Sequence, residues 1–239
     1  MRLIQENGQR WLALFLFVTL IASMAFTLVR MVNAPATLPE GGDARYDKTK
    51  SDYALMFIQC ALGVIVMLLP GWIMRKWSIQ IPSMMMVFYL LFLYGAIYLG
   101  EVRSFYYKIP HWDVILHIFS GFMLGCLSFS LVALLNKAQR VPLNLSPLFV
   151  AVFALCCSVT LGVVWELYEF TFDGLLGLNM QKFMLADGTV LAGHGALGDT
   201  MEDLLVDMLG ALAASVMGYI SLKYQKGWIE KLLIKPNHQ

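Results

Sequence analysis

Residues 148–165, LFVAVFALCCSVTLGVVW, form an uninterrupted apolar run without a single charged side chain. The run approaches the roughly 20 residues that an α-helix needs to cross the hydrocarbon core of a bilayer. Glu166 follows the run at once, and Glu169 and Asp173 come shortly after it. This stretch therefore predicts a membrane-spanning helix with acidic groups at one end.

The composition of the whole chain agrees with this interpretation. Of its 239 residues, 59% are apolar and only 14% are charged, a balance that soluble domains rarely show. The formal net charge of +1 argues against a nucleic-acid partner. The cysteines fit apolar packing inside predicted spans better than a zinc or disulfide framework. We predict an all-α, polytopic membrane bundle with lipids as its neighbours.

Six apolar runs are long enough to cross a membrane, and together they make one membrane domain over residues 1–239. They lie at residues 11–29, 53–74, 83–100, 114–135, 148–165 and 204–222. Ala34-Pro35-Ala36 imitates a signal-peptide cleavage site, but the first run exceeds the usual length of an h-region. We expect it to be retained as an anchor.

Lys and Arg are distributed unequally between the two sides of these spans. Ten fall on the side of the termini: Arg2, Arg10, Arg75, Lys76, Lys137, Arg140, Lys223, Lys226, Lys231 and Lys235. Six fall on the other side: Arg45, Lys48, Lys50, Arg103, Lys108 and Lys182. Because cytoplasmic loops hold the excess of cations, both termini are expected in the cytoplasm.

In this topology, the last three spans bring their acidic residues to the outer side of the membrane. Helical spacing places each set on one face: Asp113 with His117; Glu166 with Glu169 and Asp173; and Asp199 with Asp203 and Asp207. An unpaired carboxylate facing lipid costs about 2.5–3.5 kcal/mol or more. The three acidic faces are therefore expected to point inward, toward one shared site.

A cation would relieve the repulsion within such a site. The predicted metal ligands are His117, Glu166, Glu169, Asp173, Asp199, Asp203 and Asp207. Asp113 or His111 would shuttle protons as the catalytic groups. Many carboxylates with one imidazole suit Mg²⁺, Mn²⁺ or Ca²⁺, and they also permit Zn²⁺ or iron. The residue types do not distinguish these metals.

Structural alternatives apply to several of these residues. Asp199 equally fits an N-cap of the last helix, Asp113 fits a cap after Pro110, and Asp173 fits a loop role before Gly174. The buried members could instead form salt bridges. The cations considered for that role are Arg30, Arg103 and Lys108. Three such cations would not neutralise the whole cluster.

Small residues mark the faces through which the fourth and sixth spans pack. They are Ser120, Gly121 and Gly125 in one span and Gly210, Ala211, Ala213, Ala214 and Gly218 in the other. Small side chains let membrane helices approach closely. A second local signal is Asp187-Gly188 within residues 181–191, which favours a small β-hairpin in the last outer loop.

Taken together, the polar motifs resemble a known family. They are Gly100-Glu101; His111-Trp112-Asp113 to His117 with Ser120-Gly121; Trp165-Glu166 to Glu169-Phe170 with Asp173; and Asp199-Thr200 to Asp203-Leu204 with Asp207. Over residues 83–222 the chain resembles the YjdF family of uncharacterised bacterial inner-membrane proteins. A more distant likeness to VanZ-type proteins rests on the acidic helix starts. The resemblance implies a multi-pass protein of the bacterial inner membrane and implies no particular reaction.

Three functions remain open from the sequence. The first is a metal-dependent hydrolase or transferase that acts at the outer leaflet on a lipid or lipid-linked substrate. The second is a cation- or proton-coupled transporter, in which intramembrane carboxylates bind the coupling ion. The third is a structural or regulatory membrane subunit whose polar cluster fixes helix packing. The oligomeric state is not determined by the sequence.

Overall fold

The computed structural model describes residues 2–39, 41–43, 45–137 and 145–236. Arg140, one of the cations counted in the topology prediction, lies outside these residues. In chain order the elements are α1 (Arg2–Asn33), α2 (Lys50–Trp77), β1 (Ile79–Gln80), α3 (Ser83–Leu93), the π-helical η1 (Tyr94–Val102), α4 (Phe105–Lys108), α5 (Trp112–Lys137), α6 (Pro147–Leu176), the 3-10 turn η2 (Gly193–Leu197), α7 (Gly198–Lys223), the 3-10 turn η3 (Ile229–Lys231) and β2 (Lys235–Pro236). Six helices are long and apolar enough to span a membrane, which confirms the all-α, six-span prediction.

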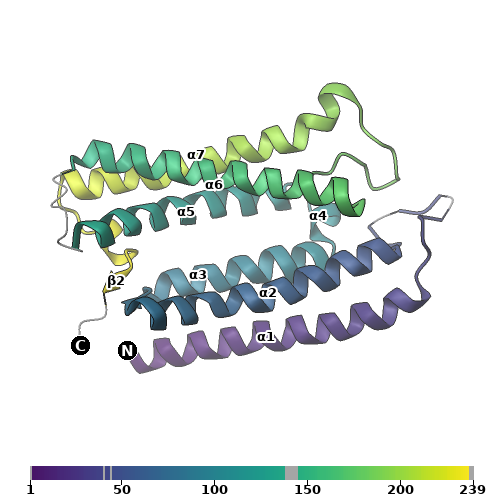
Figure 1. The fold of residues 1–239 in the computed structure, drawn as a ribbon, viewed down its shortest axis with the longest axis horizontal. Coiled ribbons are helices and arrows are strands. Elements are labelled where there is room, and N and C mark those ends of the chain that lie inside the picture. Colours follow the sequence, from purple (N-terminus) through teal and green to yellow (C-terminus); the bar gives the residue numbers. More distant parts are fainter. Residues whose placement is uncertain (1, 40, 44, 138–144, 237–239) are drawn as a thin grey trace.

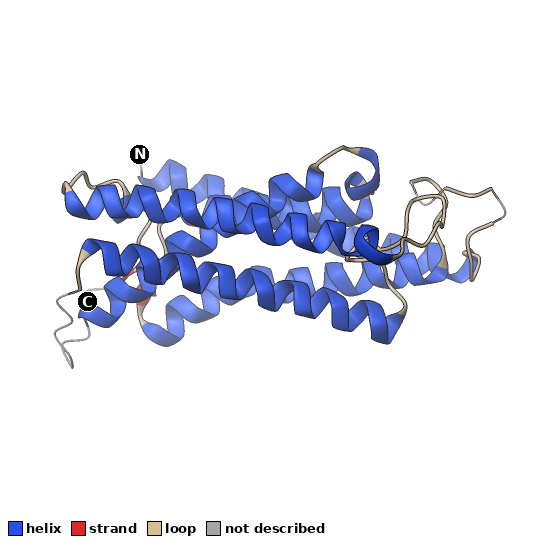
Figure 2. Ribbon diagram, turned by 90° about the horizontal axis from the view of Figure 1, so that it is seen from above, coloured by secondary structure: helices blue, strands red, loops and turns tan. Residues whose placement is uncertain are grey.

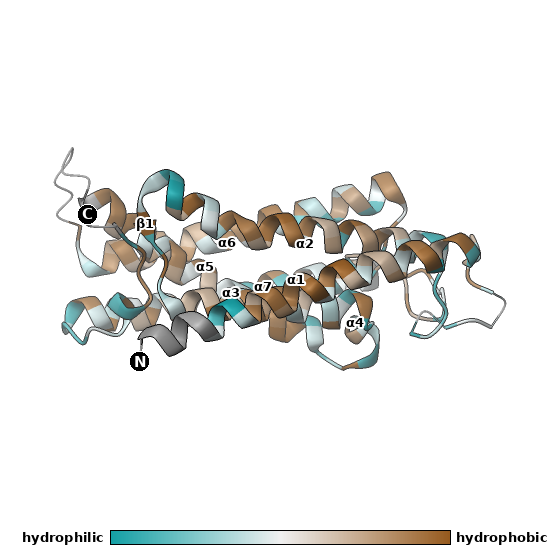
Figure 3. Cartoon of the chain, turned by 90° about the horizontal axis from the view of Figure 1, so that it is seen from below, coloured by the Kyte–Doolittle hydropathy of each residue, from teal (hydrophilic) through white to brown (hydrophobic). Residues whose placement is uncertain are grey.

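The long helices run side by side in two groups, one of α1, α2 and α3 with η1 and the other of α5, α6 and α7 (Figure 1). Packing is most extensive between α5 and α7, followed by α6 with α7 and α1 with α2. The elongated shape is also plain from above (Figure 2), and apolar residues cover much of the helices' length (Figure 3). These apolar flanks require a lipid environment.

The last two spans are longer than hydropathy alone predicts. The predicted run ending at residue 165 continues to Leu176, and the run starting at 204 begins at Gly198. The extra turns contain Glu166, Asp173 and Asp203, all of which are buried inside the protein. Hydropathy counts these residues as polar, although the bundle removes them from both water and lipid.

The third span differs from a plain α-helix because its second half is π-helical, from Tyr94 to Val102. Two glycines let aromatic side chains approach the backbone there. The Trp112 indole N–H donates to the carbonyl of Gly95 at 3.1 Å, and a Cβ at Gly100 would collide with the Tyr106 ring. The π-helical segment therefore connects the first helix group to the start of α5.

Glycines allow α5 and α7 to touch backbone to backbone. A Cβ at Gly121 would collide with the Asp207 carbonyl, and one at Gly210 would collide with the Ile118 carbonyl. At Gly125 a Cβ would lie 2.7 Å from that of Ala214. The predicted role of these small residues in close helix packing is confirmed.

The C-terminal segment joins the two helix groups at the end where α1 begins (Figure 1). β2 pairs antiparallel with β1, which follows α2 in the first group. The Ile234 amide donates to the Ser130 hydroxyl of α5 at 3.1 Å, and the Ile229 side chain is fully buried. This end of the bundle is therefore closed by the chain's own tail.

We expect Gly210→Ala to destabilise the fold, because its methyl group would force α5 and α7 apart at the Ile118 carbonyl. Overpacking of this kind costs about 1–3 kcal/mol. Thermal unfolding in detergent should show a lower midpoint. The matched control is Gly71→Ala in α2, where nothing lies within 4 Å of the added Cβ. An equal loss in both variants would contradict the close-packing explanation.

Candidate metal site

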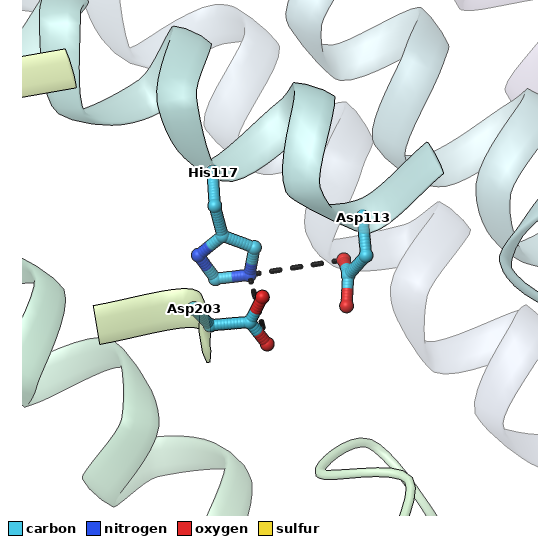
Figure 4. A group of neighbouring side chains, drawn as sticks. All are labelled: Asp113, His117 and Asp203. Carbon is cyan, nitrogen blue, oxygen red and sulfur yellow. Dashed lines mark ion pairs between the residues drawn. The ribbon is translucent and has the colours of Figure 1, made fainter. Parts of the chain in front are cut away.

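One imidazole and two carboxylates meet where α5 and α7 begin, an end of the bundle that we call the acidic end (Figure 4). One ligand atom each of Asp113, His117 and Asp203 lies within 4.8 Å of the others. His117 Nε2 is 3.7 Å from Asp113 Oδ1 and 3.7 Å from Asp203 Oδ2. Ligands of a bound divalent ion lie about 3–3.5 Å apart when metal–ligand bonds are about 2.0–2.4 Å. The two distances from His117 are close to that spacing, and the ligand atoms of Asp113 and Asp203 lie within 4.8 Å of each other.

Asp207 orients the imidazole from the opposite side. Its Oδ2 lies 3.3 Å from His117 Nδ1, and its Oδ1 accepts a hydrogen bond from the Ser120 hydroxyl at 2.8 Å. A proton on Nδ1 directed at Asp207 leaves the Nε2 lone pair pointing at Asp113 and Asp203. A carboxylate behind the imidazole is the usual arrangement around a metal-bound histidine.

Glycine at position 162 makes room for Asp207 between the helices. A Cβ there would lie 2.8 Å from Asp207 Oδ2. On the other side, Gly121 of α5 meets the Asp207 backbone, and the Ser158 hydroxyl donates to the Gly121 carbonyl at 2.9 Å. Asp207 is thus held between α5 and α6 by two glycines. Sequence reasoning treated Gly121 as a packing residue and missed Gly162 altogether.

Three carboxylates at the acidic end carry a buried oxygen without a hydrogen bond inside the described residues. They are Glu166 with both Oε atoms, Asp199 with Oδ2 and Asp203 with Oδ2. Glu166 and Asp203 are only 4% and 2% exposed. The side chains of Thr200 and Gln181 lie near the Glu166 carboxylate, outside the geometry of a direct hydrogen bond to it, and they hydrogen-bond to each other at 2.8 Å. A buried ionised oxygen without a partner is expensive, so these atoms need a ligand or a proton.

Negative groups outnumber positive ones at this end of the bundle. Glu169 is 8% exposed and interacts electrostatically with Asp113, His117 and Asp203. With it, the carboxyl groups gathered here are Asp113, Glu166, Glu169, Asp199, Asp203 and Asp207. Within the described chain, the ion-pair partners of these groups are His117 and Lys182. With all six carboxyl groups ionised, the cluster would carry a net negative charge even with both partners charged.

Lys182 is the cation that the sequence did not assign to the cluster. Its ammonium forms an ion pair with Asp113 and lies 3.3 Å from Asp199 Oδ1. Burial lowers the pKa of Lys182, but Asp113 and Asp199 outweigh that effect and raise the pKa above its ordinary value. The three cations considered as alternative partners form no ion pair with the cluster in the described residues: Arg30 donates to the Tyr53 hydroxyl, and Lys108 donates to the Arg103 carbonyl.

The loop between α6 and α7, residues 177–192, positions Lys182, and we call it the strap. Asp173 accepts the Met180 amide at 2.8 Å and the Gln181 amide at 3.0 Å. Asp173 therefore stabilises the loop, as the structural alternative to metal binding predicted. It does not join the other carboxylates. Farther along, one antiparallel bridge between Met184 and Val190 closes a turn, a minimal form of the expected hairpin.

Asp113 and Asp199, which the sequence also allowed as helix caps, form ion pairs instead. Asp199 lies inside the first turn of α7, where Leu197 occupies the N-cap position without a side-chain hydrogen bond. Asp113 lies inside α5, and its carboxylate contacts Lys182 and His117. Both helices tolerate these acids because the positive N-terminal end of a helix favours a carboxylate.

A pocket of about 170 Å³ opens beside the metal-ligand group. Its walls include Tyr106, His111, Asp113, Lys182 and Asp199. His111 is exposed, has a positive φ of 58° and lies outside the group of Asp113, His117 and Asp203. Asp113 lines this pocket and also belongs to the group with the buried His117 and Asp203.

Comparison with known proteins assigns the chain to a family. Residues 14–224 match the family model described as "Predicted membrane protein (DUF2238)". The chain belongs to this family. A protein of Thermotoga maritima described as "Uncharacterized protein" is 32% identical over 122 residues, which are 51% of this chain and 54% of that protein. The chain thus matches about half of that relative's length.

No solved structure matches the chain. The DUF2238 assignment supports membership in a family of predicted membrane proteins, and it assigns no reaction, ligand or partner. The chemistry of this DUF2238 protein must therefore be argued from its own side chains.

Asp173→Ala is expected to loosen the strap, because the Met180 and Gln181 amides lose their charged acceptor. Hydrogen bonds to a charged group contribute about 1.5–3 kcal/mol, so both amides should exchange hydrogen at least about tenfold faster. Hydrogen exchange with mass spectrometry would measure this. The control is Thr171→Ala, whose hydroxyl bonds only to the Leu167 carbonyl of its own helix. Unchanged exchange in Asp173→Ala would disprove this role.

Proposed function

We propose that this DUF2238 protein binds a divalent metal ion through Asp113, His117 and Asp203 and uses it for hydrolysis or transfer on a lipid or lipid-linked substrate. The observation that carries the proposal is the preformed group of three donors, in which a buried Asp203 oxygen has no hydrogen bond within the described residues. A divalent cation would satisfy that oxygen. It would also reduce the excess of negative charge around it.

Each neighbouring residue has a distinct role in this proposal. Asp207 and Ser120 fix the imidazole with Nε2 toward the ion. Neither oxygen of Glu166 has a direct hydrogen bond within the described residues, so this carboxylate is available as a further ligand or as the acceptor of a proton. A bound divalent ion supplies an activated water and neutralises charge that develops on a phosphate or ester. The adjacent pocket gives a small polar headgroup access to Asp113.

The position of the site favours an enzyme over a transporter. Carriers typically bind their substrate near the bilayer midplane on interrupted helices. Here the three donors lie at the starts of α5 and α7, and both helices are continuous. The interrupted geometry in this chain is η1, which does not contribute to the donor group. Transport remains the second hypothesis, and the experiments below separate the two.

Metal analysis of the purified full chain tests the site. We expect Mn²⁺ to bind the wild type, and we expect Asp203→Asn and His117→Ala to weaken binding by more than about 100-fold. Ser120→Ala, which removes a bond to Asp207, should cost about 10–100-fold, as is typical for groups that orient a ligand. Asp43→Asn is the acidic control, because Asp43 pairs with Arg45 and not with the donor group, and it should bind normally. Equal binding by all variants would rule out this site.

The reaction can be followed in nanodiscs of bacterial phospholipids by mass spectrometry of the lipids. With Mn²⁺ present, the wild type should change the headgroup composition, whereas Asp203→Asn should leave it unaltered. Metal binding without any lipid conversion, together with Mn²⁺ uptake into sealed vesicles, would favour the transporter.

We also propose that the protein lies in a bacterial inner membrane with both termini in the cytoplasm and the acidic end outside. The excess of Lys and Arg on the side of the termini supports this orientation. The start of α1 and β2 lie at the same end of the molecule, as this topology requires (Figure 1).

An impermeant maleimide applied to intact cells checks the orientation. Asp187→Cys in the strap should be labelled, because residue 187 is exposed beyond α6 and would face the outside. Lys226→Cys, which follows α7 and is also exposed, should react only after the membrane is opened. The parent chain controls for the native cysteines. The reverse pattern would place the acidic end in the cytoplasm.

A further inference from the structure

Lys182 shares a metal-ligand carboxylate with the donor group. Asp113 Oδ1 faces His117 Nε2 at 3.7 Å, and the other oxygen of the same carboxylate pairs with the Lys182 ammonium. Asp199 holds the ammonium from a second side at 3.3 Å, and the Tyr106 ring lies 5.6 Å from it. The ammonium therefore sits at the boundary between the open pocket and the buried donors.

The strap holds this lysine in place with several directional contacts. Besides the two amides bound by Asp173, the Asn179 side chain donates to the Met184 carbonyl at 2.7 Å and accepts the Met184 amide at 2.9 Å. The backbone of Lys182 has a φ of 46°, a left-handed conformation that residues other than glycine rarely adopt. Such a backbone persists where surrounding contacts enforce it.

The strap thus delivers a positive charge to a fixed place beside the donors. A tethered group competes with free ions at an effective concentration that reaches millimolar even for a flexible link. A monovalent ion that displaced the ammonium from Asp113 would exchange one positive charge for another. A divalent ion doubles the Coulomb attraction to the same carboxylates. A divalent ion therefore competes with Lys182 for these carboxylates more effectively than a monovalent ion does.

We propose that Lys182 is the specificity-determining residue of the site, a tethered ammonium that excludes monovalent ions and yields Asp113 only to a divalent ion. This inference rests on the proposed metal site and adds the class of ion that the site selects. It also assigns the strap a task, because the strap holds the ammonium at Asp113 Oδ2, next to the Oδ1 atom that would face the ion.

Mn²⁺ titration of the full chain in detergent, followed by electron paramagnetic resonance, tests the inference. Wild type and Lys182→Gln are titrated in N-methylglucamine chloride and in NaCl at the same ionic strength. In the first salt, we expect Lys182→Gln to bind Mn²⁺ at least about tenfold more tightly than the wild type, because the competing charge is gone. In NaCl, the variant should lose most of this gain, whereas the wild type should hardly respond.

Lys108→Gln is the matched control, since Lys108 is exposed on the same side, donates to the Arg103 carbonyl and lies over the Tyr46 ring, away from the donor group. It should behave like the wild type. Asp173→Ala keeps the lysine but loosens the strap, so it should shift Mn²⁺ affinity in the same direction as Lys182→Gln. This second variant tests the inference if Lys182→Gln fails to fold.

The outcomes separate the two proposals. If the wild type binds Mn²⁺ and neither Lys182→Gln nor Asp173→Ala changes its affinity or its response to sodium, the role of Lys182 is disproved while the metal site stands. A lower thermal stability of Lys182→Gln with unchanged Mn²⁺ affinity would show a merely structural ion pair. If no variant and no wild-type sample binds Mn²⁺, the metal site itself is disproved.

Discussion

Backbone contact between α5 and α7 is the constraint on which the acidic end depends. Glycines at positions 121 and 210 let the two helices touch without intervening side chains. That approach brings His117 of α5 within reach of Asp203 and Asp207 of α7, with separations of 3.7 and 3.3 Å. Larger residues at the glycines would separate these groups, so packing and chemistry are set by the same contact.

Burial makes this arrangement energetically demanding. Glu166 and Asp203 are almost fully enclosed, and each has at least one oxygen without a hydrogen bond among the described residues. Carboxylates are rarely buried in this way unless they are paired or bound to a metal. Lys182 supplies part of the compensation, yet it engages only Asp113 and Asp199. The remaining charge is the physical reason to propose a divalent ion in the centre.

The sequence predicted the six spans because apolar length is a local property. It also predicted that acidic groups on three helices meet, since helical spacing and topology place Asp113, Glu166 and Asp203 at one level. It was less successful with helix ends. Glu166 and Asp173 reduce the local hydropathy, although the folded bundle buries both of them. Apart from the two glycines in this segment, nothing in the sequence pattern indicated the π-helical geometry of η1.

Composition and periodicity by themselves determined the membrane class, the six helices long enough to span a membrane and the set of acidic candidates. Only the tertiary structure decided which candidates meet: Asp113, His117 and Asp203 form the donor group, Asp207 supports the imidazole, and Asp173 turns to the strap. It also identified Lys182, a loop residue whose distance along the chain from Asp113 hides their contact. Spacing along one helix fixes a face, whereas the partner of that face depends on how helices far apart in sequence pack.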